Sequence, residues 1–137
     1  MTSPFGPVRL LRSGQLTPSV PYAYAAATDR PGRLLFTAGA CPLDEECRVV
    51  APGDHVAQAE QVLANLRTVL REAGTDLTDV VKTTVYVASD RREVLGEVWD
   101  VVARTFGEHD APSTLLGVAA LGWPDQLVEV EAVAVLP

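Results

Sequence analysis

Two carboxylates stand out because they lie on a stretch that otherwise has the composition of a buried strand. Glu129 and Glu131 alternate with Val128, Val130 and Ala132 near the C-terminus. Successive side chains of a strand point to opposite faces, so both carboxylates share one face. Glu is depleted in strands and is costly to bury unless it is solvated, paired or hydrogen-bonded. Two interpretations follow: a face that is wet or paired with Lys or Arg, or a site in which a partly buried carboxylate serves as a general base or orients water.

The sequence has few other side chains that are typical of catalytic or metal sites. Cys41 and Cys47 have no CxxC spacing, and the two histidines, His55 and His109, do not complete a metal-ligand pattern. We therefore expect free thiols, no metal and no other cofactor, and we leave open whether Cys41, Cys47 or His109 contributes to a site. The formal net charge of −7 disfavours nucleic acid as a partner, because a surface that tracks phosphates is normally basic.

The length and composition fit a small globular protein. A chain of 137 residues with 47% apolar and 21% charged residues can bury a core, and we expect a single domain over residues 1–137. There is no run of about 18 apolar residues, and the N-terminus lacks the apolar segment of a signal peptide. We therefore expect a cytoplasmic protein that does not bind a membrane.

The apolar periodicity predicts the elements that position the carboxylates. Alternation predicts a short strand at residues 8–11 and longer strands at 22–28, 34–40, 80–88, 114–121 and 127–135. Spacing of three and four predicts a helix that begins after Asp54 and ends before Gly74, and a second at about residues 91–106 that Gly107 ends. The main order is ββαβαββ, an α+β arrangement.

Turn signals and crossovers predict how the strands pair. Gly and Pro between 28 and 34, and again at 122–124, predict antiparallel hairpins of 22–28 with 34–40 and of 114–121 with 127–135. Right-handed crossovers place both helices on one face of a sheet of five to six strands. The other face is too apolar to leave in water, so we expect a symmetric oligomer with ligand pockets at its subunit boundaries.

Several stretches in this order and spacing form a recognisable set. They are Pro21-Tyr22, LFTAG at 35–39, QVLANL at 61–66, Ala73-Gly74, DVVKTTVYV at 79–87, FGEH at 106–109 and VEVEA at 128–132. With them the chain resembles the Rid family, also called YjgF or L-PSP endoribonuclease. The resemblance implies a chorismate-mutase-like fold and a homotrimer with three clefts between subunits. It also implies hydrolysis of reactive enamines and imines such as 2-aminoacrylate, which gives a 2-keto acid and ammonia.

The same resemblance suggests site residues and shows departures from the family pattern. In imine-hydrolysing members an arginine clamps the substrate carboxylate, and alignment places Ser113 at its position. Ala38, Trp99 and Leu115 stand where many members have Ser, Asn and Cys. Glu129 is retained, and the resemblance implies that it holds the attacking water. The residues implied to contact substrate are Tyr22, Ala38, Gly39, Trp99, Ser113, Thr114 and Leu115.

These positions also have structural interpretations. Tyr22 and Trp99 are aromatic residues that can pack in a core, and Gly39 can allow a close backbone approach. Ser113 and Thr114 can turn the chain ahead of the last strands. The sequence alone does not separate these interpretations from ligand binding.

Three functions are consistent with the chain, and we rank them. Loss of a bidentate arginine contact costs roughly 2 to 4 kcal/mol of carboxylate binding. The leading hypothesis is therefore an atypical deaminase-like hydrolase that uses Glu129 and water on a small molecule less anionic than standard 2-imino acids. The alternative is a non-catalytic trimer that binds a metabolite or a partner protein. Endoribonuclease activity ranks third, because the acidic chain shows no phosphate track.

Overall fold

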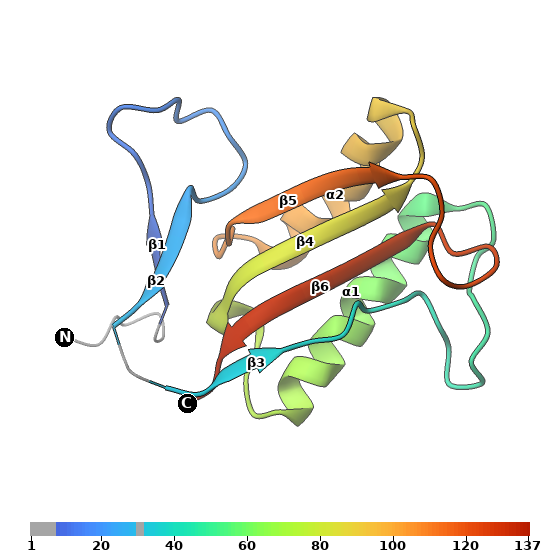
Figure 1. Cartoon of the computed structure of the whole chain (residues 1–137), viewed down its shortest axis with the longest axis horizontal. Coiled ribbons are helices and arrows are strands. Elements are labelled where there is room, and N and C mark those ends of the chain that lie inside the picture. The colour runs from blue at the N-terminus through green and yellow to red at the C-terminus, as the bar shows by residue number, and fades with distance from the viewer. Residues whose placement is uncertain (1–7, 30–31) are drawn as a thin grey trace.

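The computed structural model describes residues 8–29 and 32–137. In this part of the chain, six strands and two α-helices form the α+β fold predicted from the sequence (Figure 1). The strands are β1 (Val8–Leu11), β2 (Ala25–Thr28), β3 (Leu34–Phe36), β4 (Val80–Ala88), β5 (Ser113–Val118) and β6 (Val128–Val135). The helices are α1 (His55–Glu72) and α2 (Arg92–Phe106), and a 3₁₀ turn, η1 (Leu77–Asp79), precedes β4.

The central sheet has four strands in the order β3-β6-β4-β5. The α2 crossover joins β4 to a parallel β5, as the right-handed crossover predicts, while β6 runs antiparallel to both β4 and β3. Strands β1 and β2 form a separate two-stranded sheet. The prediction of one sheet of five to six strands is therefore wrong in its distribution of strands, although the fold class is confirmed.

Both hairpins predicted from turn signals are wrong. Strand β6 pairs with β4 and β3, and β4 lies between β6 and β5. The reason is topological: the α2 crossover places β5 on one edge of β4, which leaves the other edge for β6. Strand β2 pairs with β1, and β3 pairs with β6; residues 30 and 31 of the expected turn lie outside the described residues. A turn signal shows where the chain reverses, but not which strand becomes the neighbour.

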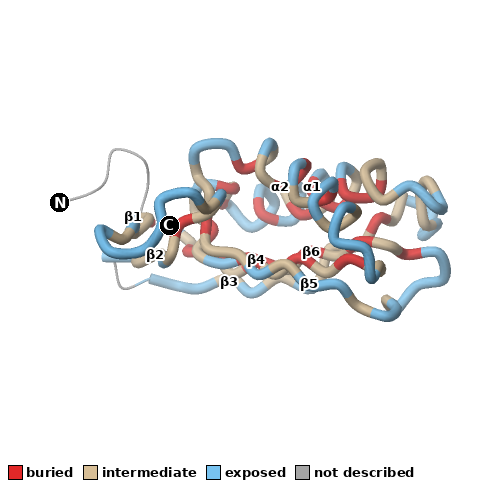
Figure 2. Tube along the Cα trace, turned by 90° about the horizontal axis from the view of Figure 1, so that it is seen from above, coloured by how far each residue is buried: buried red, intermediate tan, exposed pale blue. Residues whose placement is uncertain are grey.

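The core lies between the sheet and the two helices, which cover the same face (Figure 2). Val85 and Val87 on β4, Val98 on α2, and Val128 and Val130 on β6 have no exposed surface. The alternation of β6 is therefore as predicted, with Glu129 and Glu131 on the face away from the helices. We call this second face the open face of the sheet.

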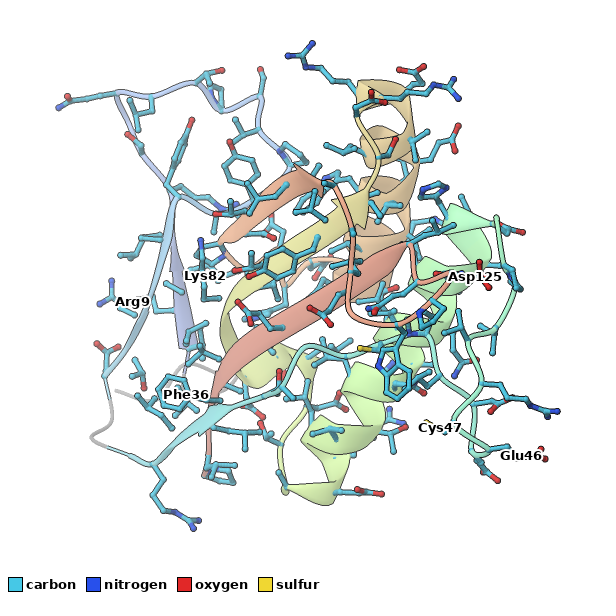
Figure 3. All side chains as sticks on the ribbon, turned by 45° about the vertical axis from the view of Figure 1, so that its right-hand side comes forward. Arg9, Phe36, Glu46, Cys47, Lys82 and Asp125 are labelled. Atoms are coloured by element: carbon cyan, nitrogen blue, oxygen red, sulfur yellow. The ribbon has the colours of Figure 1, made fainter. Side chains whose placement is uncertain are left out.

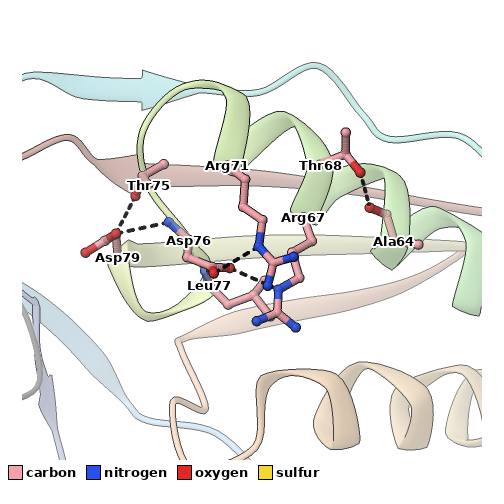
Figure 4. Close-up of polar contacts among 8 residues, drawn as sticks. All are labelled: Ala64, Arg67, Thr68, Arg71, Thr75, Asp76, Leu77 and Asp79. Atoms are coloured by element: carbon pink, nitrogen blue, oxygen red, sulfur yellow. Dashed lines mark hydrogen bonds and ion pairs between the residues drawn. The ribbon is translucent and has the colours of Figure 1, made fainter.

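Capping residues fix both ends of α1 at the predicted places, whereas α2 begins after Arg91 without a side-chain cap bond. The carboxylate of Asp54 accepts the backbone N–H of Ala57 at the start of α1, and Gly74 after α1 has a φ of +87°. Asp76 caps η1, and its two oxygens accept from Arg67 and Arg71 at 3.1 and 3.2 Å (Figure 4). This cluster fixes the connection from α1 into β4, and thereby the register of the strand that runs beside Glu129.

Candidate functional site

Glu129 lies on the open face near the start of β6, where it is opposite Tyr86 of β4. It is half-buried, because the segment after β3 runs alongside it. That segment is held by a bridge in which the Ala40 N–H donates to Val130 O at 2.7 Å and the Val130 N–H donates to Ala40 O at 3.2 Å. The bridge brings Gly39 and Cys41 beside the carboxylate.

The contacts of the Glu129 carboxylate are with neutral groups. The Cys41 Sγ lies 3.1 Å from Oε1, and the Gln126 Nε2 donates to the same oxygen at 3.4 Å. A Cβ atom at Gly39 would lie 2.5 Å from the Glu129 Cδ, a distance that packed side chains do not adopt. Gly39 therefore allows the backbone to lie close to Glu129. A close backbone approach was one of the two interpretations of this glycine in the sequence.

Burial and the nearby carboxylate control the ionisation of Cys41. Burial is the largest cause that raises the pKa of the thiol to about 11, followed by its hydrogen bond to Glu129 and the negative charge there. At neutral pH the thiol is protonated and donates to Glu129. Sequence reasoning left the role of Cys41 open, but a signal was present: residues two apart in an extended segment point to the same side, so Gly39 and Cys41 share their orientation.

Gln126, which the sequence analysis did not single out, is a buried connector. It is 4% exposed, its Oε1 accepts the Trp123 N–H at 3.1 Å, and its Nε2 also donates to Val128 O at 3.1 Å. Gln58 of α1 supports the same loop, because it accepts from the Leu127 N–H at 2.7 Å and donates to Asp125 O at 3.0 Å. The loop before β6 is thus fixed to α1 by side-chain amides.

The second carboxylate of the strand is paired differently. The Tyr86 hydroxyl donates to Glu131 Oε1 at 2.8 Å, and this bond is the main cause that raises the tyrosine pKa. Lys82, four residues earlier on β4, donates instead to the Thr114 hydroxyl at 3.1 Å. Within the described residues neither Glu129 nor Glu131 has a Lys or Arg at ion-pair distance. Among the described residues of one protomer, the ion pairing that the first interpretation allowed is therefore not found.

Five of the predicted contact residues line one hollow of about 390 Å³ beside the β5 edge of the sheet: Tyr22, Trp99, Ser113, Thr114 and Leu115, together with Pro21. The Tyr22 and Trp99 rings meet edge to face, with centroids 6.4 Å apart. The Ser113 hydroxyl accepts from Thr83 at 2.7 Å, and the Trp99 Nε1 is buried without a hydrogen-bond partner. None of the residues that line this hollow is charged.

The remaining predicted site residues lie elsewhere. Ala38 and Gly39 line a second hollow of about 280 Å³ with Cys41 and residues of α1. Glu129 lies against two of these residues, Gly39 and Cys41. Strand β4 separates this group from the hollow at β5. The structure therefore divides the predicted site into two groups on one protomer rather than bringing it together.

Other candidate residues serve the fold or stand apart. The His109 Nε2 lies 2.8 Å from Val80 O, and Cys47 is exposed with a free thiol. Among residues 8–29 and 32–137, no three His, Cys, Asp or Glu side chains gather as a metal site would need. Neither helix in this part of the chain combines the length and apolar character required to cross a bilayer.

Comparisons with known proteins agree with this fold. Residues 14–136 match the family model described as Endoribonuclease L-PSP. A RutC family protein of Pyrococcus abyssi is 35% identical over 117 residues, which cover 85% of this chain and 87% of the relative. The mouse protein named 2-iminobutanoate/2-iminopropanoate deaminase is 36% identical over 116 residues, or 84% of this chain and 81% of the relative. A Rid-family protein of unknown function from Yersinia pestis has a solved structure with a TM-score of 0.84 at 34% identity, covering 95% of this chain and 99% of that one.

Proposed function

The chain belongs to the Rid family, the family of the Endoribonuclease L-PSP model, and we propose that it is an atypical imine or enamine hydrolase in which Glu129 holds the attacking water. The observation that carries this proposal is the half-buried Glu129 carboxylate, which contacts the Cys41 thiol and the Gln126 amide and, among residues 8–29 and 32–137, no cation. A carboxylate held by neutral donors remains able to accept a proton from water. The mouse relative's name gives the same class of reaction.

The proposed reaction needs only water and one group that accepts and returns protons. An enamine first takes a proton at carbon and loses one from nitrogen, which gives the imine. Water then adds its oxygen to the imine carbon while Glu129 accepts a proton from that water and passes it to nitrogen, which gives a neutral carbinolamine. The hydroxyl proton of the carbinolamine then passes to nitrogen as the carbon–nitrogen bond breaks, which releases ammonia and a carbonyl compound. No oxidant or reductant is required.

The hollow beside β5 suggests the class of substrate. Its walls include two aromatic rings, two hydroxyls and Leu115, and the family resemblance implies that Ser113 stands at the position of the arginine. A carboxylate would find no guanidinium there, because the cation that contacts a lining residue is the single ammonium of Lys82, which is bonded to the Thr114 hydroxyl. A bidentate guanidinium contact contributes about 2 to 4 kcal/mol. We therefore propose a neutral, more apolar imine rather than a standard small 2-imino acid.

The separation of the two residue groups supports a site shared between subunits. On the open face Phe36 and Leu116 are 70% and 41% exposed, and Phe36 and Lys82 can be located in Figure 3. Exposed apolar side chains on one sheet face favour burial against copies of the same chain. We propose a homotrimer in which the hollow of one subunit faces Glu129 of the next.

Ammonia release tests the activity. Wild type, Ser113→Arg and Glu129→Gln are compared on freshly generated 2-aminoacrylate and 2-iminobutanoate, and on a neutral aryl ketimine. The proposal expects wild type to act on the ketimine, Ser113→Arg to gain activity on the imino acids, and Glu129→Gln to lose both. Glu129→Gln with unchanged turnover would refute the assigned role. Silence of wild type and Ser113→Arg on all substrates would favour a non-catalytic binding protein.

Co-expression tests the shared site. Glu129→Gln and Trp99→Ala subunits are each expected to be inactive alone. In randomly mixed trimers about a quarter of the clefts combine an intact hollow with an intact Glu129, so about a quarter of wild-type turnover should return. No recovery in mixed trimers would place the whole site within one subunit.

A further inference from the structure

The two carboxylate oxygens of Glu129 have different neighbours. Both donors reach Oε1, with Cys41 Sγ at 3.1 Å and Gln126 Nε2 at 3.4 Å. A Cβ atom at Gly39 would approach the other oxygen, Oε2, to 2.8 Å. Oε2 therefore lies over Gly39, which has no side chain. Oε1 is thus engaged by side chains, while Oε2 lies over bare backbone.

Both donors come from segments that the fold holds firmly. Cys41 follows Ala40, whose two backbone bonds to Val130 tie it to β6. Gln126 is 4% exposed, and its own carbonyl oxygen is engaged by the Trp123 N–H. Because both donors are held in place by these bonds, they restrain the carboxylate that they contact.

We infer that Cys41 and Gln126 are positioning residues for Glu129, which hold Oε1 through neutral hydrogen bonds and so direct Oε2 toward the reacting water. The part of this inference that concerns the reacting water rests on the proposed function. The two hydrogen bonds to Oε1 can be tested without a substrate. It also gives Cys41 a defined role: the thiol acts as a proton-bearing donor, and neither as a nucleophile nor as a metal ligand.

The chemistry of the thiol supports a donor role. A cysteine that acts as a nucleophile has a lowered pKa, usually beside a cation or a helix N-terminus. Cys41 has the opposite environment, since burial and the adjacent carboxylate raise its pKa to about 11. A protonated thiol has one hydrogen to donate, and the ionised carboxylate is the strongest acceptor near it.

The first experiment measures the Cys41 thiol in the full chain, in a Cys47→Ser background that leaves one reactive sulfur. The rate of alkylation by iodoacetamide is followed from pH 7 to 12 in this background and with Glu129→Gln added. We expect the thiol pKa to fall in the Glu129→Gln variant, because the charge and its hydrogen bond are removed while burial remains, and alkylation at pH 9 to rise severalfold. Glu131→Gln is the matched control and leaves the rate unchanged, because Glu131 is bonded to Tyr86. An unchanged thiol pKa in Glu129→Gln would overturn the inference, whether or not the protein is a hydrolase.

The second experiment separates positioning from packing once a substrate is identified. Cys41→Val replaces the thiol with an apolar side chain that is one methyl group larger and has no donor, and Cys41→Ser keeps a donor. We expect Cys41→Val to lower kcat about tenfold, a part of the roughly 10²–10⁴-fold that a general base contributes, with little change in KM, and Cys41→Ser to recover most of the loss. Equal kcat values in the two variants would overturn the positioning role; absence of turnover in wild type would refute the proposed function and leave the alkylation result to decide the hydrogen bond.

Discussion

At the scale of single residues, the site shows which sequence predictions were possible. The alternation of β6 was enough to place Glu129 and Glu131 on one face. It could not show that Glu131 accepts from Tyr86 or that Glu129 meets Cys41, because the partners are 45 and 88 residues away. Contacts at that separation depend on strand order, which the periodicity of one segment does not contain. The roles of Cys41 and Gln126 therefore became visible only with the fold.

Replacement of Gly39 should affect Glu129 directly. In Gly39→Ala the new methyl group would lie 2.5 Å from the Glu129 Cδ, so the carboxylate must move or the strand must shift. We expect a loss of about 1 to 3 kcal/mol in the free energy of unfolding, typical of overpacking, and a lower kcat on any identified substrate. Urea denaturation measures the first effect and steady-state kinetics the second.

Gly96 provides the matched control for this substitution. It lies in α2, and a Cβ there would meet no atom within 4 Å. Gly96→Ala should therefore raise the free energy of unfolding by about 0.5 to 1 kcal/mol, the usual gain of Ala over Gly in a helix. If Gly39→Ala were as stable as Gly96→Ala, the close approach to Glu129 would be refuted.

The raised pKa of the Cys41 thiol also predicts a pH dependence of stability. The folded thiol keeps its proton up to about pH 11, whereas the ordinary value is 9.0. Between these values the unfolded chain has lost a proton that the folded chain retains, so stability falls as the pH rises. This contribution is complete below pH 9.0 and disappears through about pH 11. Urea midpoints from pH 8 to 11 should decline less in Cys41→Ser than in wild type; parallel declines would contradict the raised pKa.

At the scale of elements, local signals predicted helices better than strand pairing. Asp54, Gly74 and Gly107 marked helix ends because capping is a property of neighbouring residues. The two predicted hairpins were wrong because strand pairing depends on distant parts of the chain. Strand β4 lies between β5 and β6, and β3, the partner expected for β2, pairs with β6. The prediction that both helices lie on one face was correct, since crossover handedness is a general rule and not a local signal.

Gln58 tests how strongly helix α1 holds the loop that carries Gln126. Its amide bonds to Ala51 O, Asp125 O and the Leu127 N–H, and it is fully buried. Gln58→Leu fills a similar volume but leaves these backbone groups without partners in the interior. We expect the free energy of unfolding to fall by about 2 to 4 kcal/mol, measured by urea denaturation.

Gln61, one turn along the same helix, serves as the control for Gln58. Its amide donates to the Asn65 side chain on a half-buried face, and water can replace that bond. Gln61→Leu is expected to change the free energy of unfolding by less than about 1 kcal/mol. Equal losses in both variants would indicate a general effect of amide removal and would argue against a specific link between α1 and the loop.

At the scale of the whole molecule, the open face of the sheet is the feature that a single subunit leaves unexplained. The helices cover one face (Figure 2), while Phe36 and Leu116 remain exposed on the other. Lys82 and Glu131 lie on that same face without an ion-pair partner among the described residues. A face that mixes exposed apolar groups with unpaired charges of both signs is suited to a copy of itself, because rotation can place each charge opposite its complement.

The final prediction follows from that face. Phe36→Asp places a charge where the proposed homotrimer buries an aromatic ring, so we expect monomers by sedimentation equilibrium and loss of any turnover that depends on a shared cleft. The subunit itself should stay folded, because Phe36 is 70% exposed and contributes little to the core of the protomer. Leu16→Asp is the control, since Leu16 is 56% exposed but lies in the loop between β1 and β2, away from the sheet. A trimer that survives Phe36→Asp, or a wild type that is already monomeric, would show that the open face is not the interface, and the two half-sites would then need another explanation.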